Sequence, residues 1–219
     1  MGMIAVVGGT GPQGKGLAYR FALLGHEVVL GSRDISRSQE TAVEINSKLS
    51  APTVVGATNV DAVGAADVVL LAVPWDGHAV LVESLADHLA GKIVISCVNP
   101  LGFDQDGPFG LDLKESAAQE TQRLVPAAKV VGAFHHVAAL SLWKTPEFLH
   151  HEDVLVCGDD VDAKSTVQDL AASVTGKRGI DVGGLRLARQ LEPLTAVLIS
   201  VNKRYKTRSG VAITGVDGG

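Results

Sequence analysis

The sequence predicts a doubly wound α/β fold, a Rossmann-type parallel sheet covered by helices on both faces, with a small C-terminal α/β extension. Short apolar runs alternate with longer amphipathic stretches, as strands alternate with crossover helices in such folds. Most runs are continuously apolar, which is typical of parallel strands buried on both faces. The first run leads directly into a glycine-rich turn, GGTGPQG, where this fold class places its phosphate-binding loop.

Strands and helices are expected to alternate through the first two thirds of the chain. The strands are expected at residues 3–8, 27–31, 67–73, 92–98 and 129–134. The helices are expected at residues 14–25, 36–49, 77–89 and 114–124. Together these elements predict a cofactor-binding Rossmann domain over residues 1–145.

A smaller α/β pattern follows over residues 146–219. It contains a predicted strand and turn at 153–160, a helix at 162–175, a short strand at 179–184 and a last helix from about Leu185. The last helix carries an apolar stripe, Leu187, Leu191, Leu194, Leu198 and Val201, that faces either the core or a second subunit. Pro193 either kinks this helix or marks its first turn.

Composition restricts the classes of function. No apolar run approaches the roughly 18 residues of a membrane span, and the first residues lack the basic region of a signal peptide. Cys97 and Cys157 lie too far apart to suggest a disulfide framework, so a cytoplasmic protein is expected. The net charge is −5, yet residues 177–208 hold eight basic residues and two acidic ones. With a single aromatic residue there and an acidic remainder, we expect no nucleic-acid partner; the basic segment attracts a smaller anion or consists of solvated helix ends.

The glycine-rich turn predicts a dinucleotide site. Gly9, Gly11 and Gly14 form G-x-G-x-x-G between the first strand and a helix. The glycines allow a tight turn, close approach of the pyrophosphate and close helix–strand packing, and the helix N-terminus offers unpaired N–H groups. The alternative is a tight glycine turn that binds no ligand.

The end of the second strand predicts a preference for NADP. An acidic residue usually binds the NAD ribose about 20 residues after the motif. Here the strand ends in Ser32 and Arg33, and Arg37 follows one helical turn later. These side chains suit a 2′-phosphate, which an acid would repel. Arg33 could also stack on the adenine; alternatively, Arg33 is an ordinary surface residue and Asp34 binds the ribose.

Later strand ends provide further candidate residues, because ligands bind beyond the carboxyl ends of the strands. Val73 and Pro74 are expected in the cofactor crevice, and Trp75 either joins them or anchors the core. Asn99 and Pro100 are expected near the nicotinamide.

The strand expected at residues 129–134 leads into His135 and His136. Adjacent strand residues point to opposite faces, so one histidine is expected to line the pocket and the other not. Paired histidines can bind metal, but no Cys or carboxylate spacing accompanies them, so we expect no metal site.

No obvious general acid–base constellation accompanies these residues. The glycines also fit the G-x-x-G-x-x-G pattern of short-chain dehydrogenases, which need Tyr-x-x-x-Lys. Tyr19 and Tyr205 are the only tyrosines, and neither is followed by lysine four residues later. Transfer of a hydride alone, between two bound cofactors, would need no such group, and no catalytic residue is assigned.

Several segments resemble, in order and over nearly the whole chain, the F420-dependent NADP oxidoreductases, also called NADPH-dependent F420 reductases. The segments are GGTGPQGKGLA, GHEVVLGSRD, AVPWDGH, VNPLGF, KVVGAFHHVAAL, LVCGDD and LEPLTAVLISVNKRYK. The resemblance implies an enzyme that transfers a hydride between C4 of NADP(H) and C5 of the deazaflavin coenzyme F420, and it implies a cytoplasmic homodimer. Both cofactors would be small-molecule substrates.

The resemblance also assigns residues to the two cofactors. It assigns the diphosphate turn to Thr10, Gly11, Pro12 and Gln13; the 2′-phosphate site to Ser32, Arg33 and Arg37; the nicotinamide to Val73 and Pro74; and the deazaflavin to His135, Val137, Ala138, Ala139, Leu194 and Asn202. The C-terminal part, 146–219, would complete the deazaflavin pocket. The sequence departs from some members at His136-Val137-Ala138, where they have Thr-Ile-Pro.

Two other functions fit the same residues. One is an NADP-dependent reductase of a small substrate, such as an imine or a hydroxy acid, which a conspicuous acid or lysine in the pocket would favour. The other is a non-catalytic NADP sensor, which would bind NADP tightly without turnover.

Overall fold

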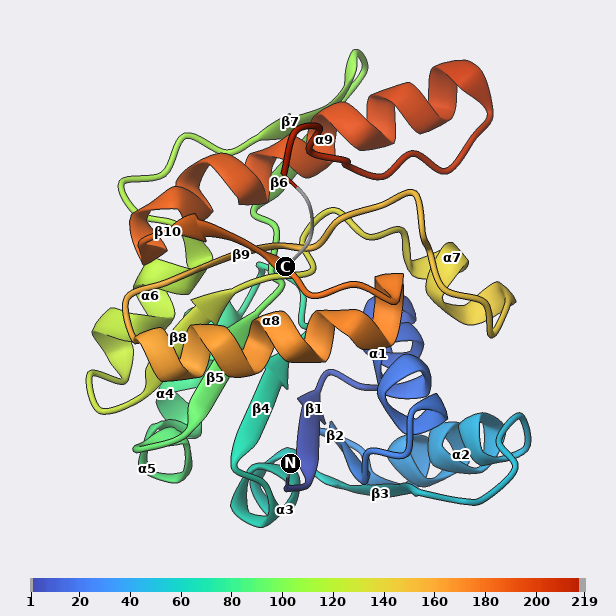
Figure 1. The fold of residues 1–219 in the computed structure, drawn as a ribbon. Coiled ribbons are helices and arrows are strands. Elements are labelled where there is room, and N and C mark those ends of the chain that lie inside the picture. Colours follow the sequence, from blue (N-terminus) through green and yellow to red (C-terminus); the bar gives the residue numbers. More distant parts are fainter. Residues whose placement is uncertain (1, 217–219) are drawn as a thin grey trace.

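The computed structural model describes residues 2–216, which form an eight-stranded sheet with helices on both faces and a separate two-stranded hairpin (Figure 1). The strands are β1 (Ile4–Val7), β2 (Val28–Ser32), β3 (Val54–Thr58), β4 (Val68–Leu71), β5 (Ile93–Ser96), β6 (Leu101–Asp104), β7 (Gly107–Gly110), β8 (Lys129–Gly132), β9 (Leu155–Gly158) and β10 (Ile180–Gly183). The helices are α1 (Pro12–Leu23), α2 (Ile35–Asn46), α3 (Asn59–Ala65), α4 (His78–Ser84), α5 (Ala86–Leu89), α6 (Ala117–Leu124), α7 (Ala139–Lys144), α8 (Val161–Thr175) and α9 (Ala188–Tyr205), with a 3-10 turn, η1 (Leu185–Leu187).

The strand order confirms the predicted doubly wound fold. The order across the sheet is β3-β2-β1-β4-β5-β8-β9-β10. From β1 the chain first adds β2 and β3 on one side of the sheet and then adds β4 on the other side, parallel to β1. A crevice for a ligand forms where the strand order switches sides in this way. The sheet is parallel except at one position, where β9, the first strand of the C-terminal part, pairs with β8 in the antiparallel sense. The connection between these two strands carries only the short helix α7, which packs on α1.

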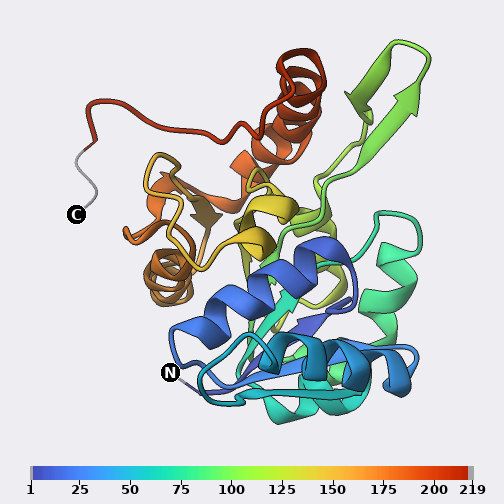
Figure 2. The ribbon, with the colours of Figure 1, turned by 90° about the vertical axis from the view of Figure 1, so that its right-hand side faces the viewer.

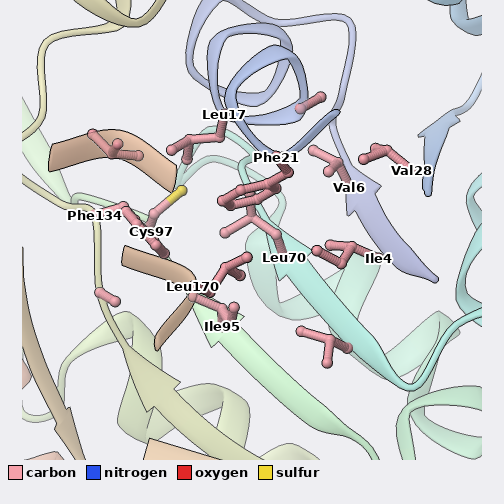
Figure 3. Packing of buried hydrophobic residues seen from close by; sticks show 14 of the residues in the cluster. Ile4, Val6, Leu17, Phe21, Val28, Leu70, Ile95, Cys97, Phe134 and Leu170 are labelled. Carbon is pink, nitrogen blue, oxygen red and sulfur yellow. The ribbon is translucent and has the colours of Figure 1, made fainter. Parts of the chain in front are cut away.

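Alternate residues of the central strands face two separate cores. Ile4 and Val6 pack with Leu17 and Phe21 of α1 on one face, where Leu170 of α8 joins the same cluster (Figure 3). Ala5 and Val7, on the other face, belong to a second cluster with residues of α3, α4, α6 and α9. Strands β9 and β10 extend the same sheet, so the C-terminal part shares its cores with the first 145 residues.

Four elements were not predicted: β3, α3, α7 and the β6–β7 hairpin. The predicted helix 77–89 is divided into α4 and α5 at Leu85. The hairpin stands away from the body of the molecule beside α9 (Figure 2). At its tip the Asp104 carboxylate accepts hydrogen bonds from the amides of Asp106 and Gly107. The Phe103 side chain is 68% exposed.

Helix α9 begins on the core and continues past it. Leu191 is buried in the second core cluster, whereas Leu194 and Leu198 further along the helix are only half-buried. Pro193 is the sixth residue of α9, so it does not mark the first turn. Because proline lacks an N–H, the Arg189 carbonyl loses its usual helical partner at that point.

Arg20 of α1 is fully buried and holds the segment that follows β8. Its guanidinium donates to the carbonyls of Leu142 at 2.8 Å, Glu147 at 2.6 Å, Ser141 at 3.0 Å and Pro146 at 3.3 Å. Burial lowers the pKa of this arginine. The carbonyls belong to α7 and the turn after it, so Arg20 fixes α7 on α1.

Among the helices of residues 2–216, none combines the length and the apolar composition that crossing a membrane would require.

Candidate cofactor-binding site

The turn between β1 and α1 leaves no space for side chains at its glycines. Gly8 has φ +77°, and a Cβ there would lie 2.5 Å from the Ala72 carbonyl oxygen. A Cβ on Gly14 would lie 2.7 Å from the Gly8 carbonyl oxygen. Helix α1 then begins at Pro12 with Gly11 as its N-cap and no side-chain cap. Its first-turn N–H groups are therefore available to an anion such as a diphosphate.

A cleft of about 500 Å³ opens where the strand order reverses, between the ends of β1, β2 and β4. It is lined by the predicted residues Thr10, Gly11, Ser32, Arg33, Arg37, Val73 and Pro74. It is also lined by residues that were not assigned to the site: Gly8, Asp34, Asn59, Ala72, Asp76, Gly77 and Leu81. Asn59 follows strand β3, which was not predicted, and Leu81 lies within the predicted helix 77–89. Only the tertiary structure brings these two residues to the cleft.

The end of β2 presents two arginines to this cleft. Arg33 and Arg37 are exposed, and within residues 2–216 neither forms an ion pair with a carboxylate. Asp34, the alternative ribose ligand, caps α2 by accepting from the Ser36 amide at 3.0 Å. Ser32 is buried, and its hydroxyl accepts from the Asp34 amide at 3.2 Å. The guanidinium groups of Arg33 and Arg37 are therefore available to bind an anion.

Trp75 does not line the cleft, although its neighbours Pro74 and Asp76 do. It packs against the second core cluster and stacks on His78, with ring centroids 5.4 Å apart. A role as core anchor is therefore observed, and contact with a cofactor stays a prediction.

The predicted residues beyond β5 and β8 form a second group. The Asn99 amide donates to the His135 carbonyl at 2.9 Å, while its Oδ1 is buried without a partner. Pro100 is buried and lines a smaller cavity of about 210 Å³, together with Glu192 and Pro193.

Neither histidine lines the larger cleft, although one was expected to line a pocket. His135 is 2% exposed, and neither of its ring nitrogens has a hydrogen-bond partner among residues 2–216. His136 Nε2 lies 3.0 Å from the Asp153 carbonyl oxygen. Burial, with a smaller contribution from His136, lowers the pKa of His135 to about 3. His135 is therefore a neutral imidazole near pH 7. Val137 is buried, and Ala138 and Ala139 are half-buried at the start of α7.

The C-terminal candidates both lie on α9. Leu194 is half-buried, and the next residue, Thr195, donates to the His135 carbonyl at 2.7 Å. The Asn202 side chain accepts from the Ser209 hydroxyl at 2.8 Å and so ties the end of α9 to the chain that follows it. Thr195 was not identified from the sequence, because its partner lies 60 residues away along the chain.

The buried acid nearest this second group is Glu192. Burial raises its pKa to about 7, against the opposing effect of the amides of Ala118 and Ala117 that donate to it. It lines the smaller cavity and not the cleft that holds the arginines. Across residues 2–216, no cluster of three or more His, Cys, Asp or Glu side chains is arranged to hold a metal ion.

Comparison with known proteins places the chain in a family. The profile of the family described as "NADP oxidoreductase coenzyme F420-dependent" matches residues 3–100. The F420-dependent NADP reductase of Methanothermobacter thermautotrophicus is 38% identical, over 96% of this chain and 94% of that protein. The F420-dependent NADP reductase of Methanocaldococcus jannaschii is 35% identical, over 98% of this chain and 99% of that protein.

A solved structure agrees with these relatives. A crystal structure from Arthrobacter sp. FB24, whose name provisionally assigns it as an F420-dependent NADP reductase, superposes with a TM-score of 0.79. It is 32% identical and covers 96% of this chain and 99% of that one. The chain belongs to the coenzyme F420-dependent NADP oxidoreductase family.

Proposed function

We propose that the protein is an NADPH:coenzyme F420 oxidoreductase that transfers a hydride between NADP(H) and F420. The observation that carries this proposal is full-length similarity to F420-dependent NADP reductases, combined with a cleft at the switch point of the sheet that presents two unpaired arginines. The direct test is reduction of oxidised F420 by NADPH.

The residues present fit the NADP half of this reaction. At Gly8 and Gly14 a Cβ would collide with carbonyl oxygens of the chain itself, so these glycines permit the tight turn that places the first turn of α1. The open N–H groups of that first turn would donate to a diphosphate. Arg33 and Arg37 would hold the 2′-phosphate, and Val73 and Pro74 would limit where the nicotinamide lies.

The chain would contribute position and exclusion of water. No residue is assigned to the proton that reduced F420 takes up with the hydride, and this proton would come from solvent. When bound, the nicotinamide supplies the hydride and the deazaflavin accepts it. A direct transfer depends on holding the reacting atoms close and aligned. Water would be excluded beside the deazaflavin by a neutral, buried side chain and four apolar ones: His135, Val137, Ala138, Ala139 and Leu194.

We propose that residues 146–219 complete the deazaflavin site and attract its anionic tail. Lys203, Arg204 and Lys206 are exposed at the end of α9. Coenzyme F420 carries a phosphodiester and a glutamate tail, which are negatively charged. A cluster of positive charges at the end of α9 would therefore raise the local concentration of F420.

Reversing these three charges to glutamate is expected to raise the KM for F420 about tenfold at low salt, with little change in the KM for NADPH. Steady-state kinetics at several salt concentrations would measure this, and high salt should reduce the difference. The control is Lys114→Glu, an exposed basic residue outside the basic segment 177–208. An unchanged KM for F420 in the triple variant would count against this role.

We also propose a cytoplasmic homodimer. Cys97 and Cys157 are buried free thiols, as is usual in a reducing compartment. Exposed apolar side chains on the hairpin and on α9, among them Phe103 and Val197, supply a surface that a second subunit could cover. Light scattering should then give about twice the chain mass of 22.7 kDa.

A further inference from the structure

The turn that follows β8 has a strained backbone that several side chains hold in place. Phe134 is fully buried and has φ +62°, a region that non-glycine residues rarely adopt. Its carbonyl accepts a hydrogen bond from the side chain of Gln13, in the first turn of α1, at 3.2 Å. Such a conformation persists only where the surroundings fix it, and it is often found at functional sites.

The next carbonyl in this turn joins two halves of the candidate site. The His135 carbonyl accepts from Asn99 Nδ2 at 2.9 Å and from Thr195 Oγ1 at 2.7 Å. Asn99 follows β5, whose carboxyl end lies at the same edge of the sheet as that of β4, and Thr195 belongs to α9. The carbonyl oxygen of His135 therefore links the segment after β5 to helix α9.

A second polar contact fixes the same part of α9. Glu192 lies one turn before Thr195 and is 2% exposed. Its carboxylate accepts from the amides of Ala117 at 2.8 Å and Ala118 at 3.0 Å, at the start of α6.

Helix α6 does not need Glu192 in order to begin. Ser116 and Gln119 already form a reciprocal capping box there. A buried carboxylate loses its hydration, so its two amide bonds serve mainly to attach α9 at one defined position. Pro193 lies between the two contacts, where the helix has lost one of its own hydrogen bonds, so external contacts matter most at this point.

We infer that Thr195 and Glu192 are positioning residues of this enzyme. Thr195 fixes α9, and with it Leu194, against the Phe134–His135 turn, and Glu192 fixes the same helix against the start of α6. Together they set the distance of the deazaflavin pocket from the NADP cleft. The inference rests on the proposed function and adds the two contacts that align the reactants. Hydride transfer is sensitive to small displacements, because a misplacement of about 1 Å can cost a factor of about 100 in rate.

The test compares three variants with the wild-type enzyme. Thr195→Val keeps the shape and removes the donor, and Thr195→Ser keeps the donor. Glu192→Gln keeps the shape but places an NH2 group where one carboxylate oxygen now accepts an amide N–H. We expect Thr195→Val and Glu192→Gln each to lower kcat/KM for F420 about tenfold, and Thr195→Ser to stay within about twofold. The Kd for NADPH, from titration of nicotinamide fluorescence, should be unchanged in all three.

The control is Thr166→Val on α8, where the hydroxyl donates to the Asp162 carbonyl of its own helix. A loss of overall folding would lower the apparent binding of both cofactors, whereas a positioning effect is confined to F420 and is rescued by serine. If Glu192→Gln does not fold, the threonine pair decides alone.

Two results would overturn the inference while the proposed function stands. The first is a wild-type enzyme that reduces F420 together with a Thr195→Val variant of equal kcat/KM. The second is a Thr195→Ser variant that loses as much activity as Thr195→Val. A wild-type protein that binds NADPH but does not reduce F420 would overturn the proposed function itself.

Discussion

Replacing Arg20 with leucine is expected to lower the free energy of unfolding by about 3–5 kcal/mol, the range for disrupting a buried charged network. The guanidinium is fully buried and bonds four backbone carbonyls, from Ser141 to Glu147. Leucine fills much of the space but removes the donor from the buried Leu142 carbonyl and from three partly buried carbonyls, and each buried group left unsatisfied costs about 1–3 kcal/mol. The loss should also loosen α7, which begins at the predicted deazaflavin residues Ala138 and Ala139.

Urea unfolding at fixed pH would measure this change, with a fall in thermal midpoint of about 10 °C as the counterpart. The matched control is Arg123→Leu on α6, where the arginine is 56% exposed and pairs with Glu115. An exposed ion pair contributes less than about 1 kcal/mol. If Arg20→Leu were no more destabilising than Arg123→Leu, the guanidinium would not be what fixes α7 on α1.

Replacing Arg33 with alanine is expected to weaken NADP binding by about tenfold to a hundredfold while leaving NAD binding nearly unchanged. A charge-assisted hydrogen bond contributes about 1.5–3 kcal/mol, and each 1.4 kcal/mol is a factor of ten. Arg33 lines the cleft beside Arg37 and, within residues 2–216, pairs with no carboxylate, so its guanidinium is available to a 2′-phosphate. The measurement is the ratio of kcat/KM for NADPH to that for NADH.

Asp34→Asn is the comparison for this experiment. Asparagine keeps the cap on α2 that the Asp34 carboxylate now provides, and it removes the charge. We expect little loss of NAD binding in this variant. A selectivity ratio that is unaffected by Arg33→Ala, together with weaker NAD binding in Asp34→Asn, would mean that Asp34 binds the ribose.

The parts of the fold that could be predicted have strong local signals. Strands β1, β4, β5 and β8 are apolar runs buried on both faces, and the glycine motif lies where it was expected. Strand β3 was missed because it is an edge strand of small and mixed residues, with Val55 exposed. The hairpin was missed because its strands, LGFD and GPFG, contain glycine, proline and aspartate, which strands usually lack; the Asp104 to Gly107 turn was the available signal.

The site divides in the same way. Residues near the glycine loop and the end of β2 could be predicted because motif spacing fixes their place relative to β1. Asn59 could not, since it follows the missed strand β3. The contacts of Thr195, Glu192 and Arg20 join residues 60 or more positions apart, and no local pattern encodes such pairs.

The most direct measurement mixes the protein with NADPH and oxidised F420 and follows the deazaflavin absorbance. The account predicts loss of that absorbance in proportion to enzyme concentration and stoichiometric with NADPH consumed, with FMN and FAD reduced slowly or not at all. Absence of any change with F420, in a preparation that binds NADPH, would contradict the proposed hydride transfer.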